Sequence, residues 1–88
     1  MLMMIRGPGE WICAEANGET VMMSVETGTY VGLNAMGARI WDLLAEPHEL
    51  EALCAMLVRD FDVTPEICRA ETQVFLDTLI RQGAVLRT

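Results

Sequence analysis

The segment VETGTYVGLNAMGARIWDLL, residues 25–44, decides the fold. Its first part alternates with a period of two, which is typical of a strand, and its second part has helical spacing. Asn34 separates the two parts, and its side-chain oxygen suits the N-cap of a helix. Thr27-Gly28 predicts a tight turn before a short strand, Tyr30–Leu33. The segment therefore predicts a strand joined directly to a helix, with strands before this corner and helices after it.

Upstream of the corner, the chain predicts a hairpin. Residues 1–9 contain glycines and a proline, and they are expected to form a loose lead-in without catalytic groups to a domain covering residues 10–88. Residues 10–16 and 20–25 have strand character, and Asn17-Gly18 between them is typical of a hairpin turn. With Tyr30–Leu33 they predict a three-stranded meander whose last strand lies at an edge.

Downstream, three helices are expected, at about residues 35–44, 49–60 and 65–82. The first buries a face that includes Gly37, where a residue unfavourable for helices predicts close backbone packing. Thr64-Pro65 marks the start of the third helix, which also carries a column that could border a groove: Ile67, Glu71, Val74 and Thr78. The predicted class is α+β, winged-helix-like, with a three-stranded antiparallel sheet followed by three helices.

Composition restricts the class of function. The formal net charge is 6 − 13 = −7, which disfavours nucleic-acid binding even though a winged-helix-like domain often binds DNA. Hydrophobic residues make up 52% of only 88 residues, so an exposed apolar patch that binds a partner is expected. The apolar N-terminus is too short for a signal sequence or a membrane span, which indicates a cytosolic protein.

Residues suited to catalysis are scarce. The chain has one histidine and no lysine, and it lacks a glycine-rich phosphate loop. Its three cysteines form no CxxC pair and are expected to be buried thiols, while His48 is expected to cap a helix or face solvent. The sequence predicts no metal site, no cofactor and no enzymatic activity.

Three runs of sequence carry a family resemblance: ETGTYVGLNAMGARIWDLL, LEALCAMLVRDFDV and FLDTLIRQGAV. Together they resemble the PqqD-like family of peptide-modification chaperones, also called RiPP recognition elements, over about residues 10–86. The resemblance implies a non-catalytic adaptor in which the leader of a precursor peptide docks as an added strand between the third strand and the third helix. One departure is Ser24, which stands where the family often has Asp.

The resemblance also implies a set of peptide-binding residues. They lie on the third strand and the third helix, with Met23 as a further lining residue: Met23, Tyr30, Val31, Gly32, Leu33, Ile67, Glu71, Val74, Phe75 and Thr78. Within this set, Leu33 and Phe75 are also suited to the core. Tyr30, Val31 and Val74 are the stronger candidates for contact with the peptide.

Several partners remain open. The short free-standing chain is most similar to the lasso-peptide type, whose partner is a leader peptidase with a cyclase downstream. The alternative within the family is a quinone-cofactor chaperone that delivers its precursor to a radical enzyme. A different class of function is a structural or regulatory module that forms a homodimer through its edge strand.

Overall fold

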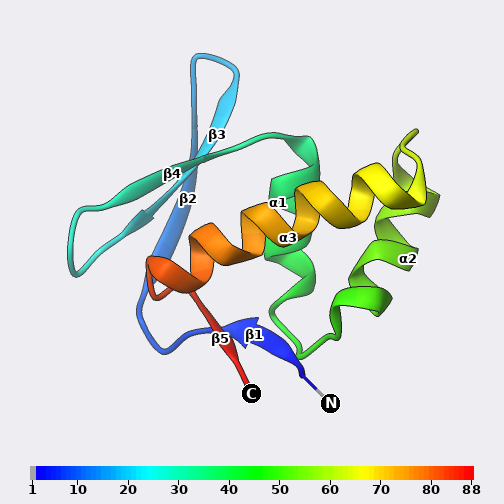
Figure 1. Ribbon diagram of the computed structural model, residues 1–88. Helices are drawn as coiled ribbons and strands as arrows, with labels where there is room; N and C mark the ends of the chain where they lie inside the picture. Colours follow the sequence, from blue (N-terminus) through cyan, green and yellow to red (C-terminus); the bar gives the residue numbers. More distant parts are fainter. Residues whose placement is uncertain (1) are drawn as a thin grey trace.

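The computed structural model describes residues 2–88 and shows a small sheet beside three helices (Figure 1). In chain order its elements are β1 (Met4–Arg6), β2 (Trp11–Ala16), β3 (Glu19–Ser24), β4 (Tyr30–Leu33), α1 (Ala35–Leu43), α2 (Leu50–Asp60), α3 (Pro65–Arg81) and β5 (Val85–Arg87). The predicted α+β class, with a three-stranded antiparallel sheet followed by three helices, is confirmed.

Strands β2, β3 and β4 form the main sheet in that order, so β4 lies at one edge. Asn17 and Gly18 close the first hairpin with φ values of 55° and 80°, the left-handed pair that a two-residue turn of this kind requires. Met22 and Ser24 are buried, whereas Met23 is exposed on the opposite face. We call the face that carries Met23 the outer face of the sheet.

The corner between β4 and α1 forms as predicted. Asn34 Oδ1 accepts a hydrogen bond from the Gly37 N–H at 2.7 Å, which caps the helix. Gly37, Ile40 and Trp41 are the buried residues of α1. The capping residue Asn34 directly follows β4, and the buried face of α1 begins three residues later at Gly37. The direction of β4 relative to α1 is therefore closely constrained.

Helix α3 also begins as predicted, with Pro65 in its first turn and Thr64 Oγ1 accepting a hydrogen bond from the Ile67 N–H at 3.3 Å. Its buried residues are Cys68, Thr72, Leu76 and Leu79. The helix packs mainly against α2 and β5. The side of α3 that is turned toward β4 is therefore left less covered.

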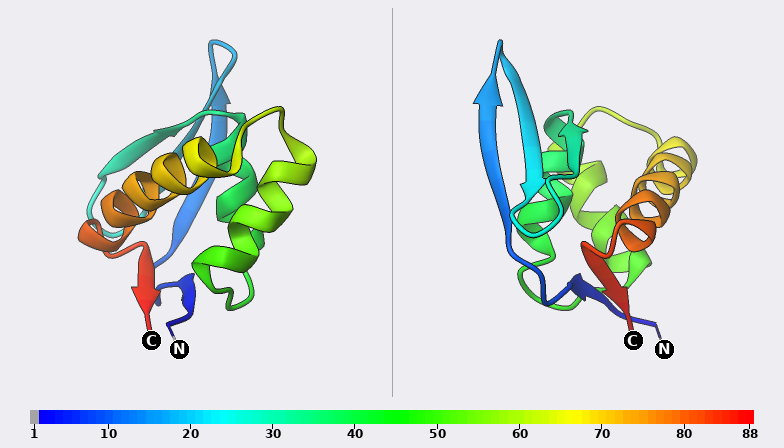
Figure 2. Two further views of the ribbon diagram at one scale, coloured as in Figure 1. Left: turned by 45° about the vertical axis from the view of Figure 1, so that its right-hand side comes forward. Right: turned by 90° about the vertical axis from the view of Figure 1, so that its left-hand side faces the viewer.

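The expectation of a loose lead-in over residues 1–9 is wrong for Met4–Arg6. This segment is β1, which pairs antiparallel with β5 and brings the two ends of the described chain side by side (Figures 1 and 2). Ala84 and Val85 are buried next to α3, so the chain folds back onto this helix after it ends. The strands are three residues long and come from opposite ends of the chain, so neither carries a periodic signal of its own.

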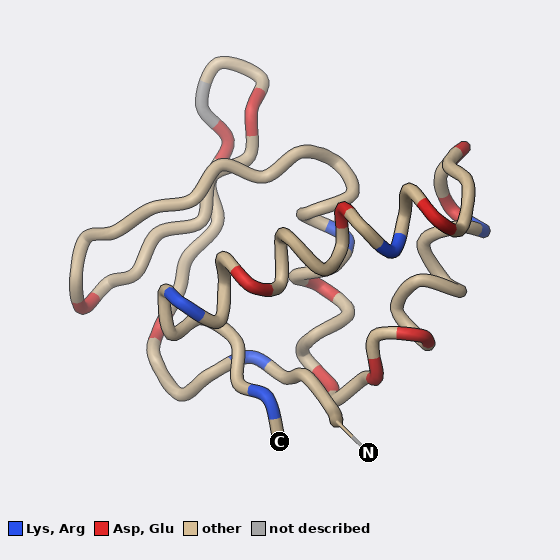
Figure 3. Tube along the Cα trace, in the orientation of Figure 1, with Lys and Arg blue, Asp and Glu red and all other residues tan. Residues whose placement is uncertain are grey.

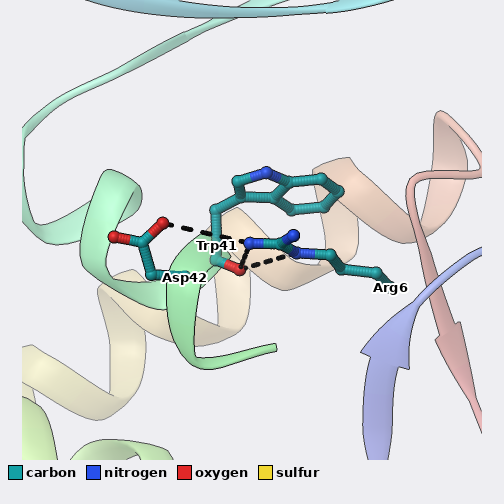
Figure 4. A network of polar contacts seen from close by, with 3 residues as sticks. All are labelled: Arg6, Trp41 and Asp42. Atoms are coloured by element: carbon teal, nitrogen blue, oxygen red, sulfur yellow. Dashed lines mark hydrogen bonds and ion pairs between the residues drawn. The ribbon is translucent and has the colours of Figure 1, made fainter. Parts of the chain in front are cut away.

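Arg6 fastens β1 to the C-terminal end of α1 (Figure 4). Its Nε and Nη2 donate hydrogen bonds to the Trp41 carbonyl at 2.9 and 2.7 Å. The guanidinium lies 4.4 Å from the centre of the Trp41 ring, and Nη2 lies 3.9 Å from Asp42 Oδ1. A cation at this position satisfies a terminal carbonyl and complements the helix dipole.

Two expectations about single residues need correction. Cys54 and Cys68 are buried as predicted, and burial together with the neighbouring Cys68 raises the pKa of the Cys54 thiol. Cys13 is exposed instead, because β2 is the strand farthest from the helix-bearing edge of the sheet. His48 is half-buried, and its backbone pairs with Met4 through hydrogen bonds of 2.8 and 3.0 Å, while Glu49 takes the N-cap position.

Acidic residues are distributed over the helices, the loops and the β2–β3 hairpin rather than gathered in one place (Figure 3). Within residues 2–88, no group of three or more His, Cys, Asp or Glu side chains is arranged to hold a metal ion. None of the helices in this range has the length and apolar character needed to cross a membrane.

Candidate peptide-binding groove

A groove of about 570 Å³ lies between β4 and α3, with α1 at its base. Figure 2 shows β4 and α3 facing one another. The lining comes from β4, the corner, α1 and α3: Val31, Gly32, Asn34, Met36, Gly37, Ile40, Ala70, Glu71, Val74, Phe75 and Thr78. A groove of this size and mainly apolar lining falls within the range of ligand-binding pockets.

The edge of β4 supplies backbone groups beside this groove. Ser24 N–H donates to the Thr29 carbonyl at 2.8 Å, so the residues of β4 that exchange hydrogen bonds with β3 are Val31 and Leu33. By the same alternation, Tyr30 and Gly32 turn their N–H and C=O groups to the other edge. Within the described chain no strand pairs with that edge, and an unpaired strand edge can accept an added strand.

The wall formed by α3 is apolar and accessible. Val74 is 66% exposed although it is a large aliphatic residue, and Phe75 is half-buried beside it. Thr78 Oγ1 donates to the Val74 carbonyl at 3.1 Å, which satisfies the hydroxyl group within the helix. This wall therefore presents mainly hydrocarbon to a ligand in the groove.

The base of the groove is set by one contact between α1 and α3. A Cβ atom built on Gly37 would lie 3.3 Å from Phe75 Cζ and 3.4 Å from Cε1. The tip of the Phe75 ring therefore rests on the bare backbone of α1. This contact explains the glycine that the sequence places on the buried face of a helix.

Polar chemistry in the groove is limited. Glu71 is the only ionisable side chain among the described lining residues, and Asn34 Oδ1 is engaged in the helix cap. On α3, Arg69 forms an ion pair with Glu51 of α2 and is not among the lining residues. This lining suits the binding of an apolar segment, and it does not bring together a nucleophile and a base.

The structure brings six of the ten predicted site residues into this groove: Val31, Gly32, Glu71, Val74, Phe75 and Thr78. Leu33 is in the core at 6% exposure. Ile67 is 51% exposed on α3 but lies outside the lining. Met23 does not line the groove as expected, because it and Tyr30 form a cross-strand pair on the outer face.

Five lining residues were not predicted: Asn34, Met36, Gly37, Ile40 and Ala70. For Gly37 the signal was present, since a glycine on a buried helix face predicts a close approach. Ala70 lies four positions before Val74, so the two residues share one side of α3 and line the same wall of the groove. Met36 carried no signal, because its place in the groove depends on the angle between α1 and α3.

Comparison with known proteins adds a family and two structures. The family model described as "Coenzyme PQQ synthesis protein D (PqqD)" matches residues 19–85. No curated protein matches the chain at the level required to count as a relative.

Two solved structures are similar to this chain. The structure "TbiB1 in Complex with the TbiA(beta) Leader Peptide" has a TM-score of 0.73 at 27% identity, over 92% of this chain and 94% of that chain. The structure "Lasso peptide synthetase B1 complexed with the leader peptide" has a TM-score of 0.74 at 20% identity, over 94% of this chain and 96% of that chain, and shows the same fold.

Proposed function

The chain belongs to the PqqD family, and on that premise we propose that it is an adaptor that binds the leader of a ribosomally made precursor peptide. The leader adds as a strand at the free edge of β4, and the adaptor presents the precursor to a maturation enzyme. The solved structure at 27% identity is itself a complex with a leader peptide, which supports this function.

The observation that carries the proposal is the combination of a free strand edge with an apolar groove. Tyr30 and Gly32 direct backbone donors and acceptors outward, and Val31 and Val74 flank the adjoining space. Backbone hydrogen bonds would provide affinity that depends little on sequence, while the groove would select every second side chain of the leader. The added strand therefore explains both features with one ligand.

The proposed adaptor has no catalytic role of its own. The groove supplies Glu71 as its single ionisable group, and general acid–base or nucleophilic catalysis requires converging groups. Chemistry on the precursor would belong to the enzyme that receives it.

For the receiving enzyme we favour a leader peptidase of the lasso-peptide type, with a cyclase downstream. The chain shares its fold with a structure named as a lasso peptide synthetase B1 in complex with a leader peptide, which is in keeping with this choice. The alternative is a radical enzyme of the quinone-cofactor pathway, in keeping with the name of the family model. The genes beside this one distinguish the two, since the first pathway requires an asparagine-synthetase-like cyclase and the second a radical enzyme.

The test uses two substitutions in the groove, Val31→Asp and Val74→Asp, with Val25→Asp as a matched control. Val25 is 52% exposed and lies away from the groove lining. A carboxylate facing an apolar ligand loses hydration without gaining a partner, so we expect each groove variant to weaken binding at least about 100-fold. Fluorescence anisotropy with a labelled leader of the neighbouring precursor gene measures the affinity, and circular dichroism verifies folding.

Val25→Asp should bind the leader as the wild type does. Wild-type affinity in both groove variants would refute the proposed site. Failure of the wild-type chain to bind the leader at micromolar concentration would refute the function itself.

The free edge of β4 also supports a second candidate, a homodimer formed by pairing the same edge of two copies. The net charge of −7 on each copy opposes this association. Light scattering at micromolar concentration decides the matter, because a strictly monomeric chain removes the dimer.

A further inference from the structure

The contact between Gly37 and Phe75 borders the groove in which the leader is proposed to dock. Val31 faces the groove from β4, and Gly37 and Phe75 line the same groove. In an added strand, alternate side chains point to the same face as Val31. Such a side chain would enter the space above the Phe75 ring.

From this placement we propose that Gly37, through Phe75, determines the size of the apolar leader side chain that the groove accepts. The inference rests on the proposed function and assigns a specificity role to a residue that does not itself need to touch the leader. The ligand that it predicts is a leader with a large apolar residue at one inward-facing position.

The geometry leaves no spare room at this contact. With a Cβ at position 37, the distance to Phe75 Cζ would be 3.3 Å and the distance to Asn34 Oδ1 also 3.3 Å. These separations are shorter than ordinary van der Waals contact between such atoms. The Asn34 side chain is held by its cap hydrogen bond, so the ring is the group that must move.

The surrounding residues leave the Phe75 ring one direction in which it can move. Ile40 and Trp41 of α1 are buried in the core, and α3 packs against α2 and β5. Phe75, by contrast, is half-buried and borders the open groove. A methyl group on residue 37 therefore raises the ring into the groove and reduces its depth.

A helix position occupied by glycine costs stability relative to alanine. At position 37 the glycine is not required by a turn, because Gly37 lies inside α1 and has no positive φ. What the absence of a side chain provides there is a deeper groove. The position therefore shows the pattern expected of a residue that serves binding in preference to helix stability.

The experiment combines Gly37→Ala with an alanine scan of the leader encoded beside this gene, measured by fluorescence anisotropy. We expect Gly37→Ala to weaken binding of the unmodified leader, which carries a large residue at the inward-facing position, about tenfold. The leader with alanine at that position should lose less than about twofold, since it does not reach the ring. This coupling distinguishes a change in groove depth from a general loss of structure.

Gly9→Ala is the matched control. It makes the same chemical change outside the described lining of the groove, where a Cβ would meet only Trp11 Nε1 at 3.7 Å, an ordinary van der Waals contact. We expect this variant to bind both the unmodified leader and the alanine-substituted leader with the affinity of the wild-type chain.

Phe75→Leu tests the inference by shortening the other residue of the contact while Gly37 stays unchanged. The shorter side chain deepens the groove, so larger residues at the inward leader position should gain affinity relative to smaller ones. The double variant Gly37→Ala/Phe75→Leu should restore the affinity that Gly37→Ala loses.

Equal effects of Gly37→Ala on both leaders, or no effect on either, would overturn the inference while leaving the proposed function intact. A wild-type chain that binds no leader would overturn both.

Discussion

Two apolar surfaces of this domain are accessible, and they differ in what they offer a peptide. The groove between β4 and α3 encloses about 570 Å³, and its lining is contributed by strand, corner and helices. The outer face of the sheet has a hollow of about 290 Å³ lined by Ile12, Ala14, Val21, Met23 and Tyr30. Of these two surfaces, only the groove combines residues of β4 with residues of a facing helix in its described lining.

Tyr30 shows how sharply the two surfaces are separated. Its side chain is 70% exposed and belongs to the outer face, while its backbone groups belong to the free edge. An exposed aromatic residue is therefore not in itself a sign of the peptide site. The comparison shows that an exposed apolar area allows binding without fixing how the ligand lies. A strand edge beside a groove also fixes the register and the direction of a bound peptide.

Among the substitutions that test the role of the strand edge against the outer face, the largest effect is expected from Gly32→Pro, which removes an outward-facing N–H from the edge of β4. Proline is tolerated at an edge strand when its nitrogen faces away from the ladder, so β4 should still pair with β3. The loss of a backbone hydrogen bond and the bulk of the ring should weaken leader binding about 100-fold. Anisotropy measures the affinity, and thermal unfolding verifies the fold.

Gly32→Ala retains the N–H and should bind normally. If Gly32→Pro bound the leader as tightly as the wild type, the leader would not use this edge, and the distinction between groove and outer face would fail.

A small effect is expected from Met23→Asp on the outer face. Met23 is 37% exposed and contacts the hollow rather than the groove, so leader affinity should change by less than about twofold. The same anisotropy titration measures leader affinity, and the result is compared directly with the affinity of Val31→Asp. A loss as large as that of Val31→Asp would move the peptide site to the outer face.

No change in leader affinity is expected from Arg6→Gln, which acts on stability alone. The substitution removes charged hydrogen bonds to the Trp41 carbonyl, so urea unfolding should show a loss of about 1 to 2 kcal/mol. Arg87→Gln on the paired strand β5 is the control for loss of charge. An unchanged unfolding midpoint would show that the network does not stabilise the fold. A changed affinity in fully folded protein would show that this end of α1 is coupled to the groove.

Much of the fold could be predicted because its signals are local. The Asn17-Gly18 turn, the Asn34 cap and the Thr64-Pro65 helix start each depend on residues within a few positions of one another. The candidate site was predicted in part for the same reason, since helical spacing places Val74 in the column on α3 that could border a groove. Met23 was misplaced because strand alternation assigns residues to two faces but does not say which face the helices cover.

By itself, the sequence determined the order of the three meander strands and the three helices, the corner at Asn34 and the column on α3 that contains Val74. These follow from backbone preferences and periodicities that act over a few residues. Only the tertiary structure decided that β1 pairs with β5, that Met23 and Tyr30 face away from the groove, and that Phe75 rests on Gly37. Each of these depends on the relative placement of segments distant in the chain, which is fixed by packing of the common core rather than by local propensity.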